Sequence, residues 1–159
     1  MSQTKKISIP KLILSCLIAL GAGGIGTLLA GGDFSIYQTL EKPPLAPPSF
    51  IFPIVWGALY ILMGIGAYFV YDSECELKKS ALSSYIFYLL LNALWPMAFF
   101  KKGALLAAFF LLASQIILLF AVINAFLKCD KKSAIFILPT LLWSIFALYL
   151  NGGFLYLNA

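Results

Sequence analysis

The side chains best able to do chemistry are aromatic rings and carboxamides that recur at helical spacing inside long apolar stretches. Spacings of three and four residues place side chains on one face of a helix. Three such faces occur, and each carries one of the three tryptophans: Phe52, Trp56, Tyr60 and Met63; Tyr88, Asn92, Trp95 and Phe99; and Trp143, Ala147, Leu150 and Asn151. If these faces meet, they would wall a cavity that suits a flat, apolar, aromatic ligand.

A belt at the bilayer interface is the alternative role of the tryptophans, because tryptophan and tyrosine are enriched there. Each tryptophan lies several residues from the nearest loop, which favours a position inside the bundle. Asn92 needs hydrogen-bond partners in apolar surroundings, so we expect it to face other helices. It could line a pocket or join helices. Asn151 has the same two roles open, and Gln115 is expected to join helices.

The composition excludes several kinds of chemistry. The chain has no histidine, which excludes a histidine-ligated haem and the usual neutral-pH general base. The apolar stretches contain no lysine or carboxylate, which argues against proton-coupled transport and ordinary acid–base catalysis. Cys16, Cys75 and Cys129 lack the spacing of a metal site, so we expect neither a metal nor a cofactor. Cys75 and Cys129 fall in loops that we place in the cytoplasm, and we expect both to be free thiols.

The elements that must position these faces are five stretches without a charged residue. Only 11% of the chain is charged and its mean hydropathy is +0.98, whereas a soluble domain is about 25% charged. Each stretch reaches the roughly 20 residues that a membrane helix needs. We therefore expect an all-α membrane protein, a five-transmembrane-helix bundle with a long structured first loop. The expected helices of this single domain (1–159) are 10–31, 50–71, 80–100, 103–128 and 133–157.

The first expected helix has an alternative interpretation, and the third contains a proline. The first could be a cleaved signal peptide, but no clear cleavage pattern interrupts its small residues, and we expect a retained helix. Pro96 lies well inside the third and is expected to kink it.

The lysines predict the orientation. With five spans, the N-terminus and the second and fourth loops share one side of the membrane. That side holds Lys5, Lys6, Lys11, Lys78, Lys79, Lys128, Lys131 and Lys132, and the other holds Lys42, Lys101 and Lys102. The positive-inside rule places the N-terminus in the cytoplasm and the first loop and C-terminus outside. The same placement accounts for the net charge of +5 without a nucleic-acid partner.

The first loop, residues 31–49, is the only long one. Its sequence, GGDFSIYQTLEKPPLAPPS, contains the stiffening prolines Pro43, Pro44, Pro47 and Pro48 together with several apolar side chains. A loop of this kind is expected to fold back on something apolar. It could be a plug on the mouth of the bundle or a lid over a ligand cavity, and the two roles are compatible.

Three segments resemble one known family. Residues 36–70, IYQTLEKPPLAPPSFIFPIVWGALYILMGIGAYFV, are similar to the loop and second helix of the TspO/MBR family of tryptophan-rich sensory and translocator proteins. LNALWPMAFF (91–100) and LPTLLWSIFALYLN (138–151) resemble its third- and fifth-helix signatures. The resemblance implies a five-helix bundle in which the first loop caps a cavity.

The resemblance also implies a ligand and a site. The ligand would be a porphyrin, with protoporphyrin IX as the usual example, bound by a sensor, scavenger or transporter that often forms homodimers. The implied cavity residues are Trp56, Tyr60, Asn92, Trp95, Trp143 and Ala147, with Pro44, Pro47 and Pro48 shaping the lid. One alternative is light- or oxygen-dependent porphyrin degradation, with Trp56 and Trp143 as redox-active catalytic partners. Another is a carrier of membrane lipid or sterol. Here no basic residue follows Tyr149 or Tyr156, so the sterol motif of the animal proteins is incomplete.

Overall fold

The computed structural model describes residues 7–158, and all elements in that range are helical. The long helices are α1 (Ile9–Ala30), α3 (Ile51–Asp72), α4 (Lys78–Pro96), α5 (Leu105–Cys129) and α6 (Lys131–Asn158); α2 (Ile36–Thr39) is a short helix in the first loop, and the π-helix η1 (Met97–Lys101) continues α4. Five segments, with α4 and η1 taken together, are long and apolar enough to cross a membrane. The expected all-α, five-helix fold is therefore confirmed, and the chain is an integral, multi-pass membrane protein. Lys5 and Lys6, which entered the orientation argument, lie outside the described residues.

Local chemistry explains how α1 begins and ends. Pro10 lies in its first turn, where the missing N–H costs nothing. Gly31 and Gly32 then adopt left-handed backbone conformations, with φ of 80° and 70°. Their N–H groups donate to Leu28 O and Thr27 O, which satisfies carbonyls at the helix end. This turn directs the chain from α1 into the first loop.

The third span changes its helix type at Pro96. We expected a kink there, and the structure shows that the chain continues beyond Pro96 as η1. Proline has no N–H, so the carbonyl of Asn92 loses its α-helical partner. A π-helical turn, in which Lys102 N–H donates to Met97 O, follows directly. The wider turn carries Phe99 and Phe100 towards the first loop.

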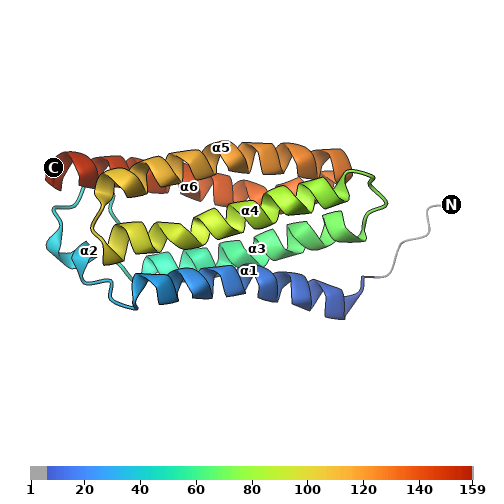
Figure 1. Cartoon of the computed structure of the whole chain (residues 1–159), viewed down its shortest axis with the longest axis horizontal. Helices are drawn as coiled ribbons and strands as arrows, with labels where there is room; N and C mark the ends of the chain where they lie inside the picture. Colours follow the sequence, from blue (N-terminus) through green and yellow to red (C-terminus); the bar gives the residue numbers. More distant parts are fainter. Residues whose placement is uncertain (1–6, 159) are drawn as a thin grey trace.

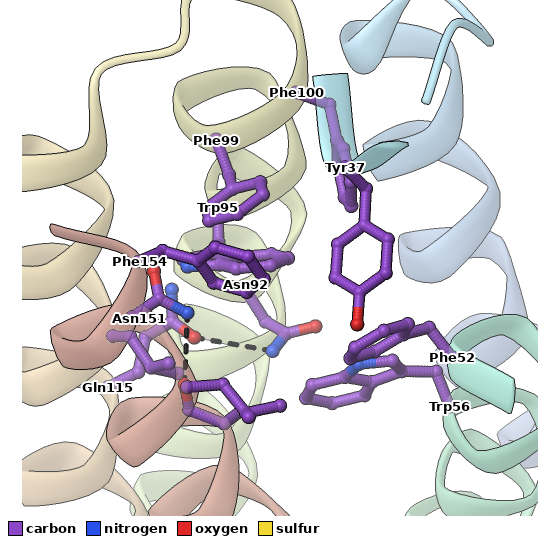
Figure 2. A pocket seen from close by; sticks show the side chains of 13 residues that line it. Tyr37, Phe52, Trp56, Asn92, Trp95, Phe99, Phe100, Gln115, Asn151 and Phe154 are labelled. Atoms are coloured by element: carbon purple, nitrogen blue, oxygen red, sulfur yellow. Dashed lines mark hydrogen bonds between the residues drawn. The ribbon is translucent and has the colours of Figure 1, made fainter. Parts of the chain in front are cut away.

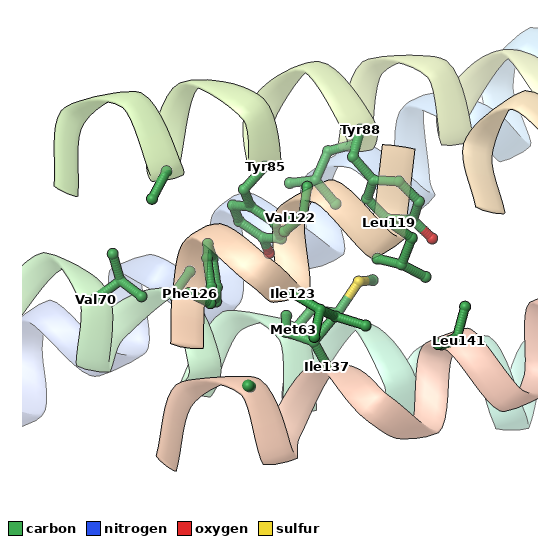
Figure 3. Close-up of a cluster of buried hydrophobic side chains, with 14 of the residues drawn as sticks. Met63, Val70, Tyr85, Tyr88, Leu119, Val122, Ile123, Phe126, Ile137 and Leu141 are labelled. Carbon is green, nitrogen blue, oxygen red and sulfur yellow. The ribbon is translucent and has the colours of Figure 1, made fainter. Parts of the chain in front are cut away.

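The helices form one bundle that places the first loop over one end (Figure 1). α1 packs against α3 and α4, α6 packs against α3 and α5, and α4 packs against α5. The first loop with α2 lies at the end where α6 finishes, and α1 starts at the opposite end. Figure 3 shows the apolar core away from the loop, where Met63, Tyr88, Leu119 and Ile137 are completely buried. Met63 and Tyr88 of the expected faces thus belong to this core.

One expectation about the loops is wrong. Cys75, in the turn between α3 and α4, is disulfide-bonded to Cys129, the last residue of α5, with a Cα–Cα distance of 5.1 Å. Fifty-four residues separate the two cysteines, so their spacing in the sequence gave no hint of the bond. They meet because α4 and α5 are neighbours that place the α3–α4 turn beside the end of α5. Neither is a free thiol in this structure.

Candidate ligand-binding site

A cavity of about 450 Å³ lies beneath the first loop, between α1, α3 and α4. Pockets for small molecules occupy about 300–1,000 Å³, so this cavity is of sufficient size for one. Its lining is Leu20, Gly23, Gly24 and Thr27 of α1; Phe34, Tyr37, Ser49 and Phe50 of the loop; Phe52, Pro53, Trp56, Gly57 and Tyr60 of α3; Asn92, Trp95 and Pro96 of α4; and Phe100 of η1. None of these residues is charged. We call this space the lid cavity.

Aromatic rings from two facing helices form the walls of the lid cavity. On α3, the rings of Trp56 and Tyr60 lie 5.8 Å apart. On α4, Trp95 lines the cavity, and it stacks at 5.1 Å and an interplanar angle of 24° on Phe99 of η1, which does not itself line the cavity. Flat faces of this kind favour a flat aromatic molecule, because rings attract one another in offset stacks and edge-to-face pairs.

The polar side chains form one hydrogen-bonded chain across three helices. Tyr60 OH donates to Asn92 Oδ1 at 2.5 Å, Asn92 Nδ2 donates to Gln115 Oε1 at 3.3 Å, and Gln115 Nε2 donates to the carbonyl of Leu91 at 2.9 Å. A carbonyl can only accept, so Leu91 fixes which end of the Gln115 carboxamide points to Asn92. Gln115 in turn holds Asn92 with its oxygen towards Tyr60. Gln115 therefore does join helices, as expected.

A second, much smaller space of about 20 Å³ adjoins the lid cavity (Figure 2). Gln115, Ala147 and Asn151 line only this smaller space, and six residues, Asn92 and Trp95 among them, line both. We call it the inner chamber. Asn151 Nδ2 donates to Ala147 O at 3.0 Å, whereas Asn151 Oδ1 and Trp95 Nε1 are buried without a hydrogen-bond partner. The chamber has room for about one water molecule.

The expected site residues thus divide into three groups. Trp56, Tyr60, Asn92 and Trp95 come together around the lid cavity, and Ala147 lies at the inner chamber. Trp143 lines neither space, because its indole packs behind Phe52, with the ring centres 6.1 Å apart. Its surroundings differ from those of the other two tryptophans, and it would not touch a ligand that fills the lid cavity.

Tyr37 of α2 fastens the first loop over the cavity. Its ring is 98% buried between Phe52 and Phe154, and its hydroxyl donates to the carbonyl of Pro47 at 2.5 Å. Burial raises the pKa of the Tyr37 phenol, so the group remains a donor at neutral pH. Beside it, Phe34 meets Phe100 edge-on at 4.8 Å.

The middle of the loop is held on α6. Glu41 N–H donates to Asn158 Oδ1 at 2.9 Å, and Asn158 Nδ2 donates back to Glu41 O at 3.0 Å. Tyr149 OH donates to Pro44 O at 2.9 Å, and Pro43 packs on Gly153, where a Cβ atom would overlap its ring. Of the expected lid prolines, Pro44 and Pro47 accept these side-chain hydrogen bonds, and Pro48 O accepts from Ile51 N–H at the start of α3.

Sequence reasoning missed three of these residues. We had counted Tyr37 only among the apolar side chains of the loop. A tyrosine can bury its ring while its hydroxyl makes a hydrogen bond, and this property could have marked Tyr37 as an anchor of the loop. Asn158 carried no signal, because its partner lies 117 residues away. Phe100 was not on an expected face, because the π-helix after Pro96 shifts the helical register.

Comparisons with known proteins follow the same pattern over most of the chain. The sequence model of the TspO/MBR family matches residues 13–157. A tryptophan-rich sensory protein of Cereibacter sphaeroides is 32% identical over 92% of this chain and 91% of its own length. A translocator protein of Ovis aries is 33% identical over 85% of this chain and 82% of its own. The tryptophan-rich protein TspO of Archaeoglobus fulgidus is 29% identical over 96% of this chain and all of its own length.

Proposed function

The chain belongs to the TspO/MBR family of membrane proteins, and from this premise we propose that it binds a porphyrin-type tetrapyrrole in the lid cavity. Binding of this kind would serve a sensor, a scavenger or a transporter. The observation that carries the proposal is an uncharged cavity of about 450 Å³ walled by aromatic rings from α3, α4 and the loop. A tetrapyrrole is flat, aromatic and largely apolar, and it matches such walls.

Each part of the site has a role in the proposal. Trp56 and Trp95 would contact the faces of the ring system, and Tyr37 and Phe34 would cover it from the lid. The Tyr60–Asn92 pair would be the polar position that sets the ligand's orientation, because a few fixed polar groups give an apolar pocket its specificity. The prolines would keep the loop in its closed shape by restricting its backbone.

The geometry favours binding over degradation. A mechanism in which Trp56 and Trp143 both formed bonds to the ligand would need both in contact with it. Trp56 lines the lid cavity, but Phe52 separates Trp143 from it. The lining also contains no carboxylate or lysine that could move a proton.

Trp143 supplies a matched control for the binding test. We would titrate the purified protein in detergent with protoporphyrin IX and follow tryptophan fluorescence, comparing Trp56→Leu with Trp143→Leu. Both variants remove one half-buried indole, so a general loss of packing affects both. We expect saturable quenching in the unaltered protein and about a tenfold weaker Kd in Trp56→Leu, equivalent to one aromatic contact of about 1.4 kcal/mol. Trp143→Leu should keep the original Kd.

Two results would contradict the proposal. Quenching that rises linearly without saturation in the unaltered protein would mean that no site exists. Equal weakening in both variants would mean that the ligand does not occupy the lid cavity. A third substitution, Asn92→Leu, should weaken binding without removing an indole, since it takes away the polar position and leaves Tyr60 and Gln115 without this partner.

A further inference from the structure

The two helices that border the lid cavity, α1 and α3, are joined firmly at one end and separate towards the other. Ser8 N–H donates to Tyr68 OH at 2.9 Å, and Ser15 Oγ donates to Gly64 O at 2.7 Å. A Cβ atom on Gly64 would overlap the backbone of Cys16, so the helices touch there. Ser8 lies at the start of α1, at the end of the bundle away from the loop, and Gly64 lies near the middle of α3.

Towards the loop, α1 also packs on α4, and its contact with α3 passes through the Tyr60 ring, which a Cβ atom on Gly23 would overlap. A Cβ atom on Gly26 would lie 3.2 Å from the Ala93 carbonyl oxygen and 3.4 Å from Pro96 Cγ, which shows that α1 and α4 are in contact. By contrast, Cβ atoms on Gly24 of α1 and on Gly57 of α3 would meet nothing within 4 Å. The space between α1 and α3 is therefore open at these two glycines.

This open space leads from the lid cavity to the outside of the bundle. Six of the cavity's lining residues border it: Leu20, Gly24, Thr27, Phe50, Pro53 and Gly57. Of these, Leu20 and Phe50 are 37% and 62% exposed, and Gly24, Thr27 and Pro53 are also exposed. The lining residues of α4 on the other side are buried or half-buried. We call this opening the α1–α3 mouth.

The α1–α3 mouth lies at membrane depth. Leu20 precedes Gly31, the end of α1, by about 16 Å of helix, and Gly57 lies about 9 Å into α3. The hydrocarbon core is about 30 Å thick, so these residues face acyl chains. Thr27, the one side chain of the six with a hydroxyl, donates it to Gly23 O of its own helix at 3.1 Å. The mouth therefore presents no unsatisfied side-chain group to lipid.

On these grounds we propose that the lid cavity exchanges its ligand with the hydrocarbon of the bilayer through the α1–α3 mouth, and not with water by lifting the loop. The loop side is closed: Tyr37, Phe34, Tyr149 and Asn158 attach it to other parts of the structure. The ligand class is an apolar, flat molecule dissolved in the membrane. The inference rests on the proposed binding function and adds the route of entry.

Two glycines on α1 give a matched test. Gly24 lines the mouth, whereas Gly21 is also exposed, has equally open space around it and lines neither cavity. Protein in lipid vesicles would be mixed rapidly with protoporphyrin IX, and tryptophan quenching would be followed over time. We expect Gly24→Leu to slow both loading and release about tenfold or more, and Gly21→Leu to behave as the unaltered protein. Loading of Gly24→Leu at the original rate would overturn the proposal.

A second experiment closes the other route. Glu41→Cys with Asn158→Cys, in a protein whose native cysteines are serine, would tie the loop to α6 through a disulfide where the two residues already meet. We expect the oxidised and reduced forms to load equally fast. Faster loading after reduction would show entry beneath the loop and overturn the proposal. Absence of saturable quenching in every form would instead contradict the binding function itself.

Discussion

At the scale of single residues, the orientation of Asn92 is the most informative detail. Its carboxamide oxygen meets Tyr60 OH because Gln115 holds its nitrogen, and Gln115 is held by Leu91 O. The polar position of the lid cavity thus depends on Gln115, a residue of α5 that lines the inner chamber. In an apolar bundle such a hydrogen-bonded chain favours one arrangement of its side chains, because each polar group left unpaired would cost free energy.

Gln115→Leu tests this dependence. The substitution leaves Asn92 Nδ2 and Leu91 O without a side-chain partner, so we expect a loss of about 1–2 kcal/mol in stability and weaker protoporphyrin IX binding. Ser114→Leu is the control, because Ser114 is exposed and its hydroxyl donates only to Leu111 O of its own helix. Thermal unfolding in detergent measures the first effect and the quenching titration the second. Equal stability and affinity of the two variants would contradict the role given to Gln115.

Asp33 gives the pH dependence of the loop. Its carboxylate accepts the N–H of Ser35 at 2.9 Å, and this hydrogen bond lowers its pKa from 3.8. Because the pKa of Asp33 is lowered in the folded state, its carboxylate stabilises the folded turn at pH values above the ordinary pKa. This stabilisation is lost as the pH falls through the lowered pKa. We therefore expect the rate of proteolysis after Glu41 in the loop, relative to that of an unstructured peptide at the same pH, to be constant between pH 5 and 8. A transition within that range would have to come from another group.

The same scale shows what a sequence can and cannot predict. The spacing of Trp56, Tyr60, Asn92 and Trp95 predicts shared helix faces, and polarity predicts that Asn92 seeks partners. The position of Trp143 was not predictable, because it depends on how α6 is rotated about its own axis. Packing of Trp143 against Phe52 of α3 goes with that rotation, and this contact joins distant parts of the chain.

At the scale of elements, the five spans follow from hydropathy, because a charge inside the hydrocarbon costs free energy and the stretches avoid it. The irregular elements cannot be predicted from hydropathy. The π-helix η1 depends on how Pro96 is accommodated, and α2 depends on Tyr37 having a pocket. The loop as a whole takes its shape from α6, which comes more than 80 residues later in the chain.

Neighbouring glycines of α6 test the attachment of the loop. Gly153→Ala would place a methyl group inside the ring of Pro43, whereas Gly152→Ala would meet Phe109 at an ordinary 3.4 Å. We expect Gly153→Ala to cost about 1–3 kcal/mol through overpacking and to speed cleavage after Glu41 by a glutamate-specific protease. Gly152→Ala should change neither. Equal protection of the loop in both variants would show that Pro43 is not held on α6.

At the scale of the whole molecule, the disulfide and the lysines indicate opposite orientations of the bundle in the membrane. Five described lysines lie in the second and fourth loops or beside them, and the positive-inside rule places that end in the cytoplasm. The Cys75–Cys129 bond lies at the same end, and such bonds are rare in a reducing compartment. We retain the cytoplasmic N-terminus as a proposal, because the lysine bias is the signal that membrane insertion reads.

The orientation has a direct test in intact cells. Lys42→Cys places a thiol in the first loop and Lys79→Cys places one at the other end, each in a protein otherwise free of cysteine. We expect a membrane-impermeant maleimide to label position 42 at once and position 79 only after permeabilisation. The reverse pattern would put the disulfide end outside and the first loop inside.

The disulfide also contributes to the stability of the bundle. It closes a loop across a sequence separation of 54 residues, which in the chain-entropy description corresponds to at most about 4 kcal/mol. We expect Cys75→Ser to lower the midpoint of thermal unfolding in detergent under non-reducing conditions. Under reducing conditions the unaltered protein should show a similar midpoint. If reduction leaves the unaltered protein's midpoint unchanged, the bond is not formed in the protein in solution.

The most direct test of the central claim is a structure of the protein with protoporphyrin IX bound. The account predicts density for a flat molecule beneath the first loop, in contact with Trp56, Trp95 and the Tyr60–Asn92 pair, and separated from Trp143 by Phe52. Density on the outer surface of the bundle, or between α5 and α6 with the lid cavity empty, would contradict it.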